Sequence, residues 1–275
     1  NSVALAVNRK DDESRLYTID LSSGKAMWVG TFTQPVVSLA FKTNPIAYAT
    51  DSDNKLYRFD PTNPSPLAVD IMGLADGEKI VGLDFRPANG QLLAISNMSQ
   101  LYSVNPSSGA VTAIGDPLMP AAMGTYIGFD FNPTVDRIRL VTDKGQNLRL
   151  HPDLGTVVAV DGSLSPGSPM ASGAAYTKNF AGTTSTALFV VDAQNDMLYQ
   201  VSPPNDGVLV EIGALGIDIT DDNGFDVGGT SDMAYGVFTV SGSAGVYSVN
   251  LMTGAAAKVS DLNFMPTSMA LGLGF

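Results

Sequence analysis

The sequence predicts an all-β protein, a six-bladed β-propeller with four-stranded blades whose ring is closed by the C-terminal strand. A short strand-and-turn motif recurs six times along the 275 residues, at spacings of 40 to 51 residues. The 28 Gly and 16 Pro are spread along the whole chain, and no stretch shows the three- and four-residue apolar spacing of a helix. One strand-like segment near the C-terminus has no hairpin of its own. We therefore expect residues 1–275 to form a single domain.

Each copy of the motif begins with alternating apolar and polar residues and ends in turn-forming residues. The alternation predicts a half-buried strand, and the Asn, Pro, Ser and Gly that follow predict a tight turn. A period of this length suits a four-stranded sheet per repeat. The copies are LYTIDLSSG from Leu16, LYRFDPTNP from Leu56, LYSVNPSSG from Leu101, NLRLHPDLG from Asn147, LYQVSPPNDG from Leu198 and VYSVNLMTG from Val246.

Three further apolar runs complete each repeat. The run just before the motif forms a hairpin with it, the run just after supplies the outer strand, and a run before the hairpin becomes the inner strand. The hairpin runs are VALAVN, IAYATD, QLLAISN, RIRLVTD, TALFVVDA and MAYGVFTV, and the outer runs are AMWVGTF, LAVDIM, VTAIG, TVVAV, VLVEIG and AAKVSDL. The inner runs are SLAFKTNP from Ser38, GLDFRP from Gly82, GFDFNP from Gly128, AAYTKN from Ala174 and GFDVGG from Gly224.

The first repeat lacks an inner strand, because the chain starts directly with VALAVN. The last segment, SMALGLGF from Ser268 to Phe275, has the inner-strand pattern and no hairpin to follow it. We therefore expect SMALGLGF to pair with VALAVN and to close the ring. Radial closure also protects the sheet edges that an open array would expose.

The overall charge restricts the partners of the chain. The formal net charge is −12, and the 15 Lys and Arg are scattered along the sequence. Such a surface repels phosphate backbones and anionic headgroups, so we expect no nucleic-acid binding. Since no apolar run approaches the roughly 18 residues of a membrane span, we expect no membrane insertion. The chain begins with Asn1, which we interpret as a processed or trimmed end, consistent with a removed signal peptide.

The stretch GFDFNPTVDRIRLVTDKGQNLRLHPDLG, Gly128 to Gly155, resembles a bacterial family catalogued as domain of unknown function 4394. The preceding GLDFRPANGQLLAISNMSQLYSVNPSSGAVTAIG and the following PPNDGVLVEIGALGID extend the resemblance over most of the chain. The family implies an exported bacterial protein, secreted or at the cell surface, often attached to larger surface-associated architectures. It implies no established activity and no catalytic residues.

Three inner-strand acids are the candidate metal ligands: Asp84 in GLDF, Asp130 in GFDF and Asp226 in GFDV. Inner strands run beside the central channel, so these carboxylates can converge on a hard cation such as calcium. Alternatively, each Asp accepts hydrogen bonds from backbone N–H groups and locks adjacent blades together. We favour this structural alternative because half of the blades lack the acid. The corresponding positions in the other blades are Ala40, Tyr176 and Gly274.

Other polar clusters offer weaker chemistry. The acidic hairpin stretches DSDNK from Asp51, DAQND from Asp192 and DDNGFD from Asp221 lack the ligand pattern of an EF-hand, so we expect solvated turns. His151 is the only histidine and occupies a turn position of its repeat. With no Cys and a single His, a catalytic triad would have to be built on His151 and a zinc site would have at most one imidazole, so no catalytic or cofactor-binding residue is assigned.

These observations favour a non-enzymatic structural, assembly or partner-binding module, whose partner is another protein or copies of itself. A calcium-dependent hydrolase of the lactonase type is the first alternative, because six-bladed propellers also host such enzymes. A carbohydrate-binding module is the second alternative. It requires several exposed aromatic side chains on one face, whereas the sequence offers Trp28 and scattered tyrosines.

Overall fold

The computed structural model describes residues 4–10, 13–20, 23–37 and 46–274. Within these ranges the named strands pair only in antiparallel fashion, and the only helical element is a short 3-10 turn, η1, at Pro204–Asp206. The all-β class is therefore confirmed. No helix in the described part of the chain has the length and apolar character required to cross a membrane. The chain divides into two compact units, residues 1–43 and 44–275.

The first unit contains a three-stranded sheet in the order β1-β2-β3. Its strands are β1 (Ala4–Lys10), β2 (Glu13–Ile19) and β3 (Ala26–Phe32). They correspond to the predicted hairpin and outer strand of the first repeat. The outer strand β3 exposes three consecutive large side chains, Met27, Trp28 and Val29.

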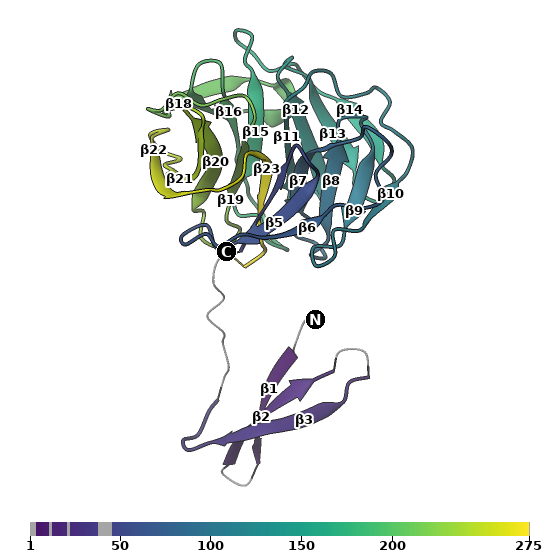
Figure 1. The fold of residues 1–275 in the computed structure, drawn as a ribbon, viewed down its shortest axis with the longest axis vertical. Coiled ribbons are helices and arrows are strands. Elements are labelled where there is room, and N and C mark those ends of the chain that lie inside the picture. The colour runs from purple at the N-terminus through teal and green to yellow at the C-terminus, as the bar shows by residue number, and fades with distance from the viewer. Residues whose placement is uncertain (1–3, 11–12, 21–22, 38–45, 275) are drawn as a thin grey trace. The chain divides into compact units, whose positions relative to one another are not determined.

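The second unit contains five four-stranded sheets, which form the blades of a propeller (Figure 1). In four blades the strands follow chain order from the centre outward. The first two of these blades are β7 (Ile80–Phe85), β8 (Leu92–Ser96), β9 (Leu101–Val104) and β10 (Val111–Ile114), and then β11 (Ile127–Asn132), β12 (Arg137–Thr142), β13 (Asn147–His151) and β14 (Thr156–Val160). The next two are β15 (Ala171–Tyr176), β16 (Leu188–Asp192), β17 (Met197–Val201) and β18 (Leu209–Ala214), and then β19 (Gly224–Val227), β20 (Ala234–Val240), β21 (Ser243–Val249) and β22 (Ala256–Asp261). The fifth blade joins β23 (Pro266–Leu271) to β4 (Ala47–Asp51), β5 (Lys55–Phe59) and β6 (Leu67–Asp70).

The inner strands of these five blades form a closed ring. Strand β7 contacts β11, β11 contacts β15, β15 contacts β19, β19 contacts β23, and β23 contacts β7 again. Five buried apolar clusters fill the spaces between neighbouring blades, each with side chains from two adjacent sheets. The propeller architecture with four-stranded blades is confirmed. The chain contains six antiparallel sheets, as predicted, and the ring that closes on itself contains five of them.

The C-terminal strand closes the ring, but its partner differs from our prediction. Strand β23 pairs with β4, in the register Met269 with Ala49 and Leu271 with Ala47, and not with the VALAVN strand β1. It therefore occupies the place in the second repeat that we expected for SLAFKTNP, a segment that lies outside the described residues. The first repeat belongs to a separate compact unit, residues 1–43, and one domain over residues 1–275 stays a prediction.

Burial explains this choice of partner. All five residues of β4 are buried, so both edges of β4 require hydrogen-bonding strands. On β23, Met269 and Leu271 pack into the same apolar cluster as Val237 of the preceding blade. The described side chains of β1, by contrast, are only partly buried or exposed. Pairing β23 with β4 thus buries the apolar face of β23 in the cluster between the β4 blade and the preceding blade.

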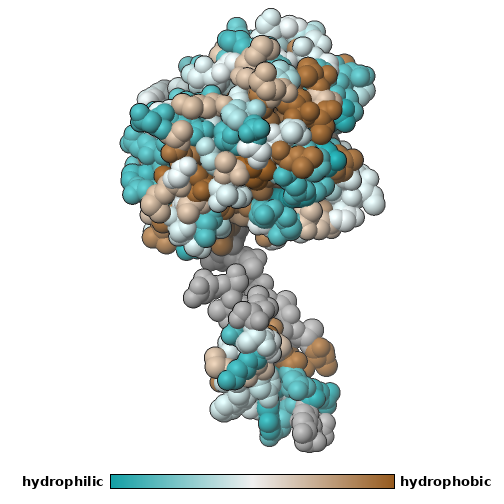
Figure 2. Space-filling view, turned by 90° about the vertical axis from the view of Figure 1, so that its right-hand side faces the viewer, coloured by the Kyte–Doolittle hydropathy of each residue, from teal (hydrophilic) through white to brown (hydrophobic). Residues whose placement is uncertain are grey.

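The outer surface of the chain is mixed in character. On the face shown in Figure 2, apolar side chains reach the surface among hydrophilic ones. Several of the exposed apolar residues lie on outer strands, including Val158 and Val160 of β14 and Val210 of β18. Outer strands of a propeller have one neighbouring strand in their own sheet, so such exposure is expected there.

Candidate functional site

The inner strands approach each other closely at one level of the ring. Each carries a small residue there, and four of the five are glycine. A Cβ atom on Gly128 would lie 2.6 Å from the Ala174 Cβ, which is too close for any side chain. The cavity at this level has a volume of about 10 Å³, room for about one water molecule. The small residues are Gly82, Gly128, Gly173, Gly224 and Ser268.

Two residues farther along the inner strands, Asp84, Asp130 and Asp226 converge on the ring axis; we call them the aspartate trio. Each is 1% exposed, and one oxygen of each lies within 4.8 Å of the corresponding oxygens of the other two. The other two strands place alanine at this level, Ala175 on β15 and Ala270 on β23. The predicted equivalents Tyr176 and Gly274 are thus displaced along the chain, and Ala40 lies outside the described residues.

Each member of the trio accepts a hydrogen bond from the backbone of the next blade. Asp84 and Asp226 also accept a second bond from the residue that follows them in their own strand. These are the inter-blade bonds that the structural hypothesis requires. The donors to Asp84 are the N–H groups of Phe85 at 2.6 Å and Phe131 at 2.8 Å, that to Asp130 is Tyr176 at 3.0 Å, and those to Asp226 are Val227 at 2.6 Å and Leu271 at 2.5 Å.

Burial and mutual repulsion disfavour three negative charges in this space. Burial raises the pKa of Asp226 to about 7. Burial, followed by the charge of Asp226, raises the pKa of Asp84 well above its usual range. Burial and the charges of Asp84 and Asp226 raise the pKa of Asp130 in the same way. The neighbouring Asp130 and Asp226 side chains also affect each other, since this contact raises the pKa of Asp130 and lowers that of Asp226.

Asn179, which follows β15, lies against the trio. Its side chain is 4% exposed and forms a hydrogen bond that lowers the pKa of Asp84. Its Oδ1 atom has no hydrogen-bond donor. A buried acceptor without a partner is rare in proteins. Sequence reasoning missed Asn179 because it is the last residue of the predicted inner run AAYTKN, past the end of β15, and nothing in that run marks it as a functional residue.

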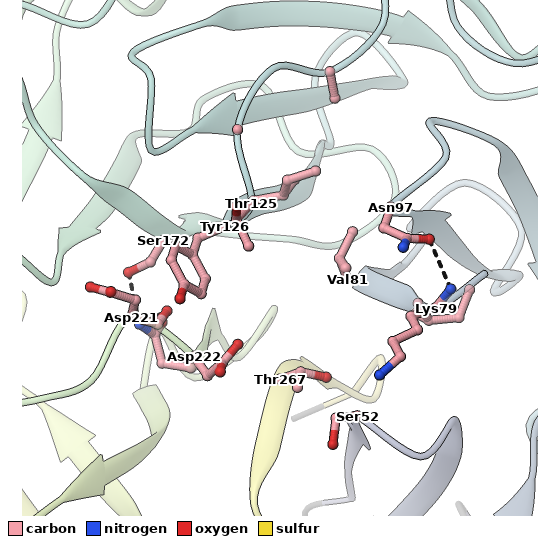
Figure 3. A pocket seen from close by; sticks show the side chains of 15 residues that line it. Ser52, Lys79, Val81, Asn97, Thr125, Tyr126, Ser172, Asp221, Asp222 and Thr267 are labelled. Carbon is pink, nitrogen blue, oxygen red and sulfur yellow. Dashed lines mark hydrogen bonds between the residues drawn. The ribbon is translucent and has the colours of Figure 1, made fainter. Parts of the chain in front are cut away.

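A larger cavity opens at the mouth of the ring, at the ends where the inner strands begin; we call it the mouth pocket (Figure 3). Its volume is about 400 Å³, which suits a small ligand. All five blades contribute to its lining. The polar lining residues include Ser52, Lys79, Tyr126, Ser172, Asp222 and Thr267.

The base of the mouth pocket contains a second buried amide with a free acceptor. Asn223 is 2% exposed, and its Nδ2 donates to Ser172 Oγ at 2.7 Å and to the carbonyl oxygens of Thr220 and Asp221 at 3.3 and 3.1 Å. The Asn223 Oδ1 atom has no donor. Because Nδ2 is fixed by three acceptors, the amide cannot rotate to satisfy Oδ1. A ligand or water that donates a hydrogen bond is therefore expected at this point.

The charges around the mouth pocket are of both signs. Asp222 and Lys79 lie on facing sides of the opening in Figure 3. Asp222 is exposed at the pocket opening, and partial desolvation of its carboxyl by the pocket walls, followed by the charge of Asp221, raises its pKa, whereas Lys79 lowers it. Burial, followed by the charge of Asp222, also raises the pKa of Tyr126. The pocket thus presents acceptors and the Tyr126 ring on one side and a cationic donor on the other (Figure 3).

The three acidic hairpin stretches differ from the predicted solvated turns. Asp51 and Asp192 do bond within their own turns, for example to the N–H groups of Lys55 and Gln194, but both are buried. The third stretch, DDNGFD, forms one wall of the mouth pocket. Its position directly before an inner strand was the sequence signal that could have identified it.

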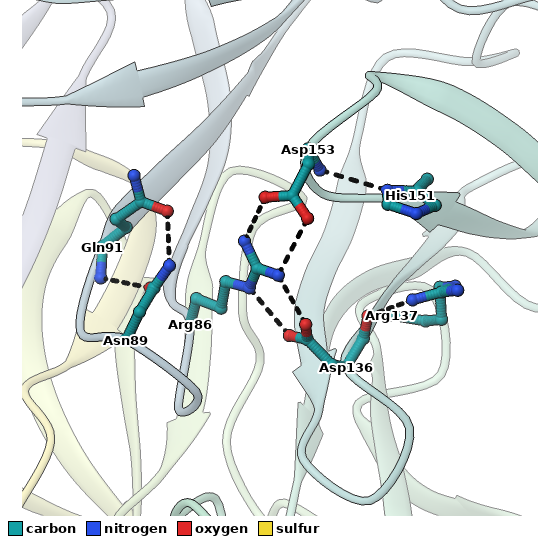
Figure 4. A network of polar contacts seen from close by, with 7 residues as sticks. All are labelled: Arg86, Asn89, Gln91, Asp136, Arg137, His151 and Asp153. Carbon is teal, nitrogen blue, oxygen red and sulfur yellow. Dashed lines mark hydrogen bonds and ion pairs between the residues drawn. The ribbon is translucent and has the colours of Figure 1, made fainter.

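His151 is the last residue of β13, so the prediction that it is a turn residue was wrong by one position; the turn begins at Pro152. Its Nδ1 accepts a hydrogen bond from the Asp153 backbone N–H at 3.2 Å. The Asp153 side chain bonds instead to Arg86 of the neighbouring blade, which also binds Asp136 through two hydrogen bonds (Figure 4). This network ties two blades together and lies apart from both the trio and the mouth pocket.

The blades and their sites define a β-propeller with a pocket at one mouth of its ring and a buried acidic cluster in its channel. A family model described as Domain of unknown function (DUF4394) matches residues 55–272, all within the ring. The chain belongs to this family. No curated protein matches it in sequence.

Solved structures of similar fold have low sequence identity to the chain. One, a protein of unknown function from Bacteroides thetaiotaomicron VPI-5482, is 15% identical with a TM-score of 0.48, over 92% of this chain and 73% of that one. TolB from Acinetobacter baumannii is 12% identical with a TM-score of 0.49, over 96% and 69%. A protein from Bacteroides fragilis NCTC 9343, described as a proposed 6-phosphogluconolactonase, is 13% identical with a TM-score of 0.39, over 98% and 83%.

Proposed function

We propose that this chain is an exported, non-enzymatic binding module, and that the mouth pocket captures a polyhydroxylated ligand such as a carbohydrate. The observation that carries this proposal is the unpartnered Oδ1 of Asn223 at the base of the pocket. A sugar hydroxyl can donate to this atom while a neighbouring hydroxyl accepts from Lys79 or donates to Asp222. The Tyr126 ring offers a surface on which a sugar ring can stack.

The geometry of the ring argues against the lactonase alternative. In such an enzyme, the substrate must reach a metal that carboxylates hold at the mouth of the channel. Here the aspartate trio is 1% exposed, and the glycine constriction, with a volume of about 10 Å³, lies between it and the mouth pocket. A substrate in the mouth pocket therefore cannot touch a metal held by the trio.

The proposal is tested by screening the full chain against immobilised glycans and measuring the affinity of any match by calorimetry. Asp222→Asn is expected to weaken binding by about 10- to 100-fold, since hydrogen bonds to charged groups contribute about 1.5–3 kcal/mol. Tyr126→Ala, which removes the ring on which the sugar stacks, is expected to weaken it by about 2- to 10-fold. Asp116→Asn, an exposed Asp outside the pocket, is the matched control. Equal binding by all variants, or no glycan bound at millimolar concentration, contradicts the proposal.

A second candidate function is assembly with a protein partner or with copies of the chain through the first sheet. The observation that favours it is the exposure of Met27, Trp28 and Val29, at 63%, 65% and 52%, on the outer strand β3. Consecutive exposed apolar side chains on an edge strand are typical of interaction surfaces. Light scattering of the wild type and of Trp28→Ser tests this candidate. An oligomer that the substitution dissociates supports it, and a wild-type monomer at high concentration contradicts self-assembly.

A further inference from the structure

The charge of the aspartate trio has no protein counter-charge in the structure. Among the ion pairs of the described residues, none involves Asp84, Asp130 or Asp226. The backbone N–H donors reduce the cost of burying these carboxylates but do not cancel their charge. Either protons or a bound cation must therefore neutralise the cluster near neutral pH.

The spacing of the trio fits one cation. Its three oxygen atoms all lie within 4.8 Å of one another. Three atoms no more than 4.8 Å apart fit inside a circle with a radius of about 2.8 Å, so an ion at its centre would lie within about 2.8 Å of all three. Calcium binds oxygen at about 2.3–2.6 Å, so side-chain shifts of a few tenths of an ångström complete the contacts. The backbone bonds leave further lone pairs on these oxygens, because each carboxylate has about four acceptor positions.

An independent observation at the same place also indicates a cation. The Asn179 side chain is buried against Asp84, and its Oδ1 atom has no donor. In the absence of a cation, the Asn179 amide directs Nδ2 toward Asp84, because the carboxylate repels the Asn179 Oδ1 atom. A half-turn about the Cβ–Cγ bond exchanges the two ends of the amide and directs the free oxygen at the trio. Amide oxygens are regular ligands of hard cations.

We infer that Asp84, Asp130 and Asp226, together with Asn179, bind one calcium ion inside the ring, where it joins three blades. All four side chains offer oxygen, which selects a hard cation over zinc or copper. Magnesium retains several of its waters, and the adjoining cavity of about 10 Å³ has room for about one. The ion is structural, because the trio is closed off from the mouth pocket. The inference is therefore independent of the ligand proposed for that pocket.

The test measures metal content and thermal stability of the full chain. Mass spectrometry of the protein, purified without chelator and dialysed, is expected to find about one calcium per chain. Chelation by EDTA is expected to lower Tm, and calcium at about 100 times its dissociation constant to raise it again by about 5–10 °C. Magnesium at the same concentration is expected to restore a smaller part.

Variants locate the ion. Asp84→Asn and Asp226→Asn are each expected to abolish the calcium-dependent rise in Tm. Asp192→Asn is the matched control, because Asp192 is also 1% exposed and bonded to backbone N–H groups but lies outside the trio. It is expected to lower Tm and to retain the calcium response. Asn179→Leu is expected to weaken calcium binding without abolishing it.

Two results would overturn the inference. One is wild-type protein that contains no calcium and melts at the same temperature in EDTA and in calcium; this result does not depend on any variant folding. The other is a calcium response that Asp84→Asn and Asp226→Asn leave unchanged. If the wild type contains no calcium and its Tm does not respond to calcium, protons neutralise the aspartate trio. Failure of the glycan-binding test leaves both measurements unaffected.

Discussion

Replacing Gly224 by alanine tests the closure of the ring at its tightest point. A Cβ atom at Gly224 would lie 2.3 Å from Met269 N, 2.5 Å from the carbonyl carbon of Ser268 and 2.6 Å from Met269 Cβ. These three atoms are backbone or Cβ atoms, so no change of rotamer can relieve the contact. Either β19 or β23 must move. Strand β23 is held in place by its ladder with β4 and by the hydrogen bond from Leu271 N to Asp226 at 2.5 Å.

Overpacking of a close-packed interior costs about 1–3 kcal/mol, and we expect the upper end here because both strands are held on their other sides. For a unit of about this size, 1 kcal/mol corresponds to about 2–4 °C, so Gly224→Ala should lower Tm by about 6–12 °C. Calorimetry of the full chain measures this shift.

The matched control is Gly272→Ala, just beyond β23. A Cβ there lies 3.1 Å from the Ile46 carbonyl oxygen, and the next nearest atom is 3.8 Å away. Both substitutions reduce the entropy of the unfolded chain equally, so the difference between them isolates the clash. We expect Gly272→Ala to lower Tm by less than a third as much. If Gly224→Ala melts within about 2 °C of the control, β19 and β23 do not approach as described and the reasoning fails.

Three further predictions concern other parts of the ring. Because the chain has no Cys and Ala49 is paired with Met269, the double variant Ala49→Cys/Met269→Cys should lose both free thiols on mild oxidation, and thiols that stay titratable would refute the pairing of β4 with β23. Arg86→Ala should lower the free energy of unfolding by about 1–3 kcal/mol in urea, and a double-mutant cycle with Asp136 should show coupling; additive effects would mean that the pair contributes nothing. In EDTA, stability should fall as pH rises from about 4 to about 7, since the native state keeps a proton on Asp226 that the unfolded state has lost, and Asp226→Asn should flatten this slope; a wild-type profile without the slope would contradict the raised pKa.

The sequence predicted the strands well because each repeat carries its own local pattern of apolar runs and turn residues. It also predicted that the last segment is an inner strand. It did not predict which hairpin that strand joins, because both candidate hairpins have the same local pattern. The choice depends on the burial of β4, which results from contacts between residues that are distant in sequence.

The candidate sites show the same contrast between features that local sequence patterns predict and features that depend on three-dimensional packing. Asp84, Asp130 and Asp226 were predicted to face the channel because they recur at one place in the inner strands, and the structure brings them together. Asn179 and Asn223 carry no repeat signal, so only the structure reveals their unpartnered oxygens. Three-dimensional packing, and not residue type, distinguishes them from the other asparagines of the turns.

The joint between β4 and β23 has a consequence for the kinetics of folding. The hydroxyl groups of Thr50 and Ser268 bond at 2.5 Å across this joint, although the two residues are 218 positions apart. Loops of such length close slowly, and their entropic cost must be met before the contact contributes any stability. The other four blades each fold from consecutive residues, so they can form first. The inner edge of the β4 hairpin stays unpaired until β23 binds to it. We expect this closure to be the slow final step of folding and the first contact to break during unfolding.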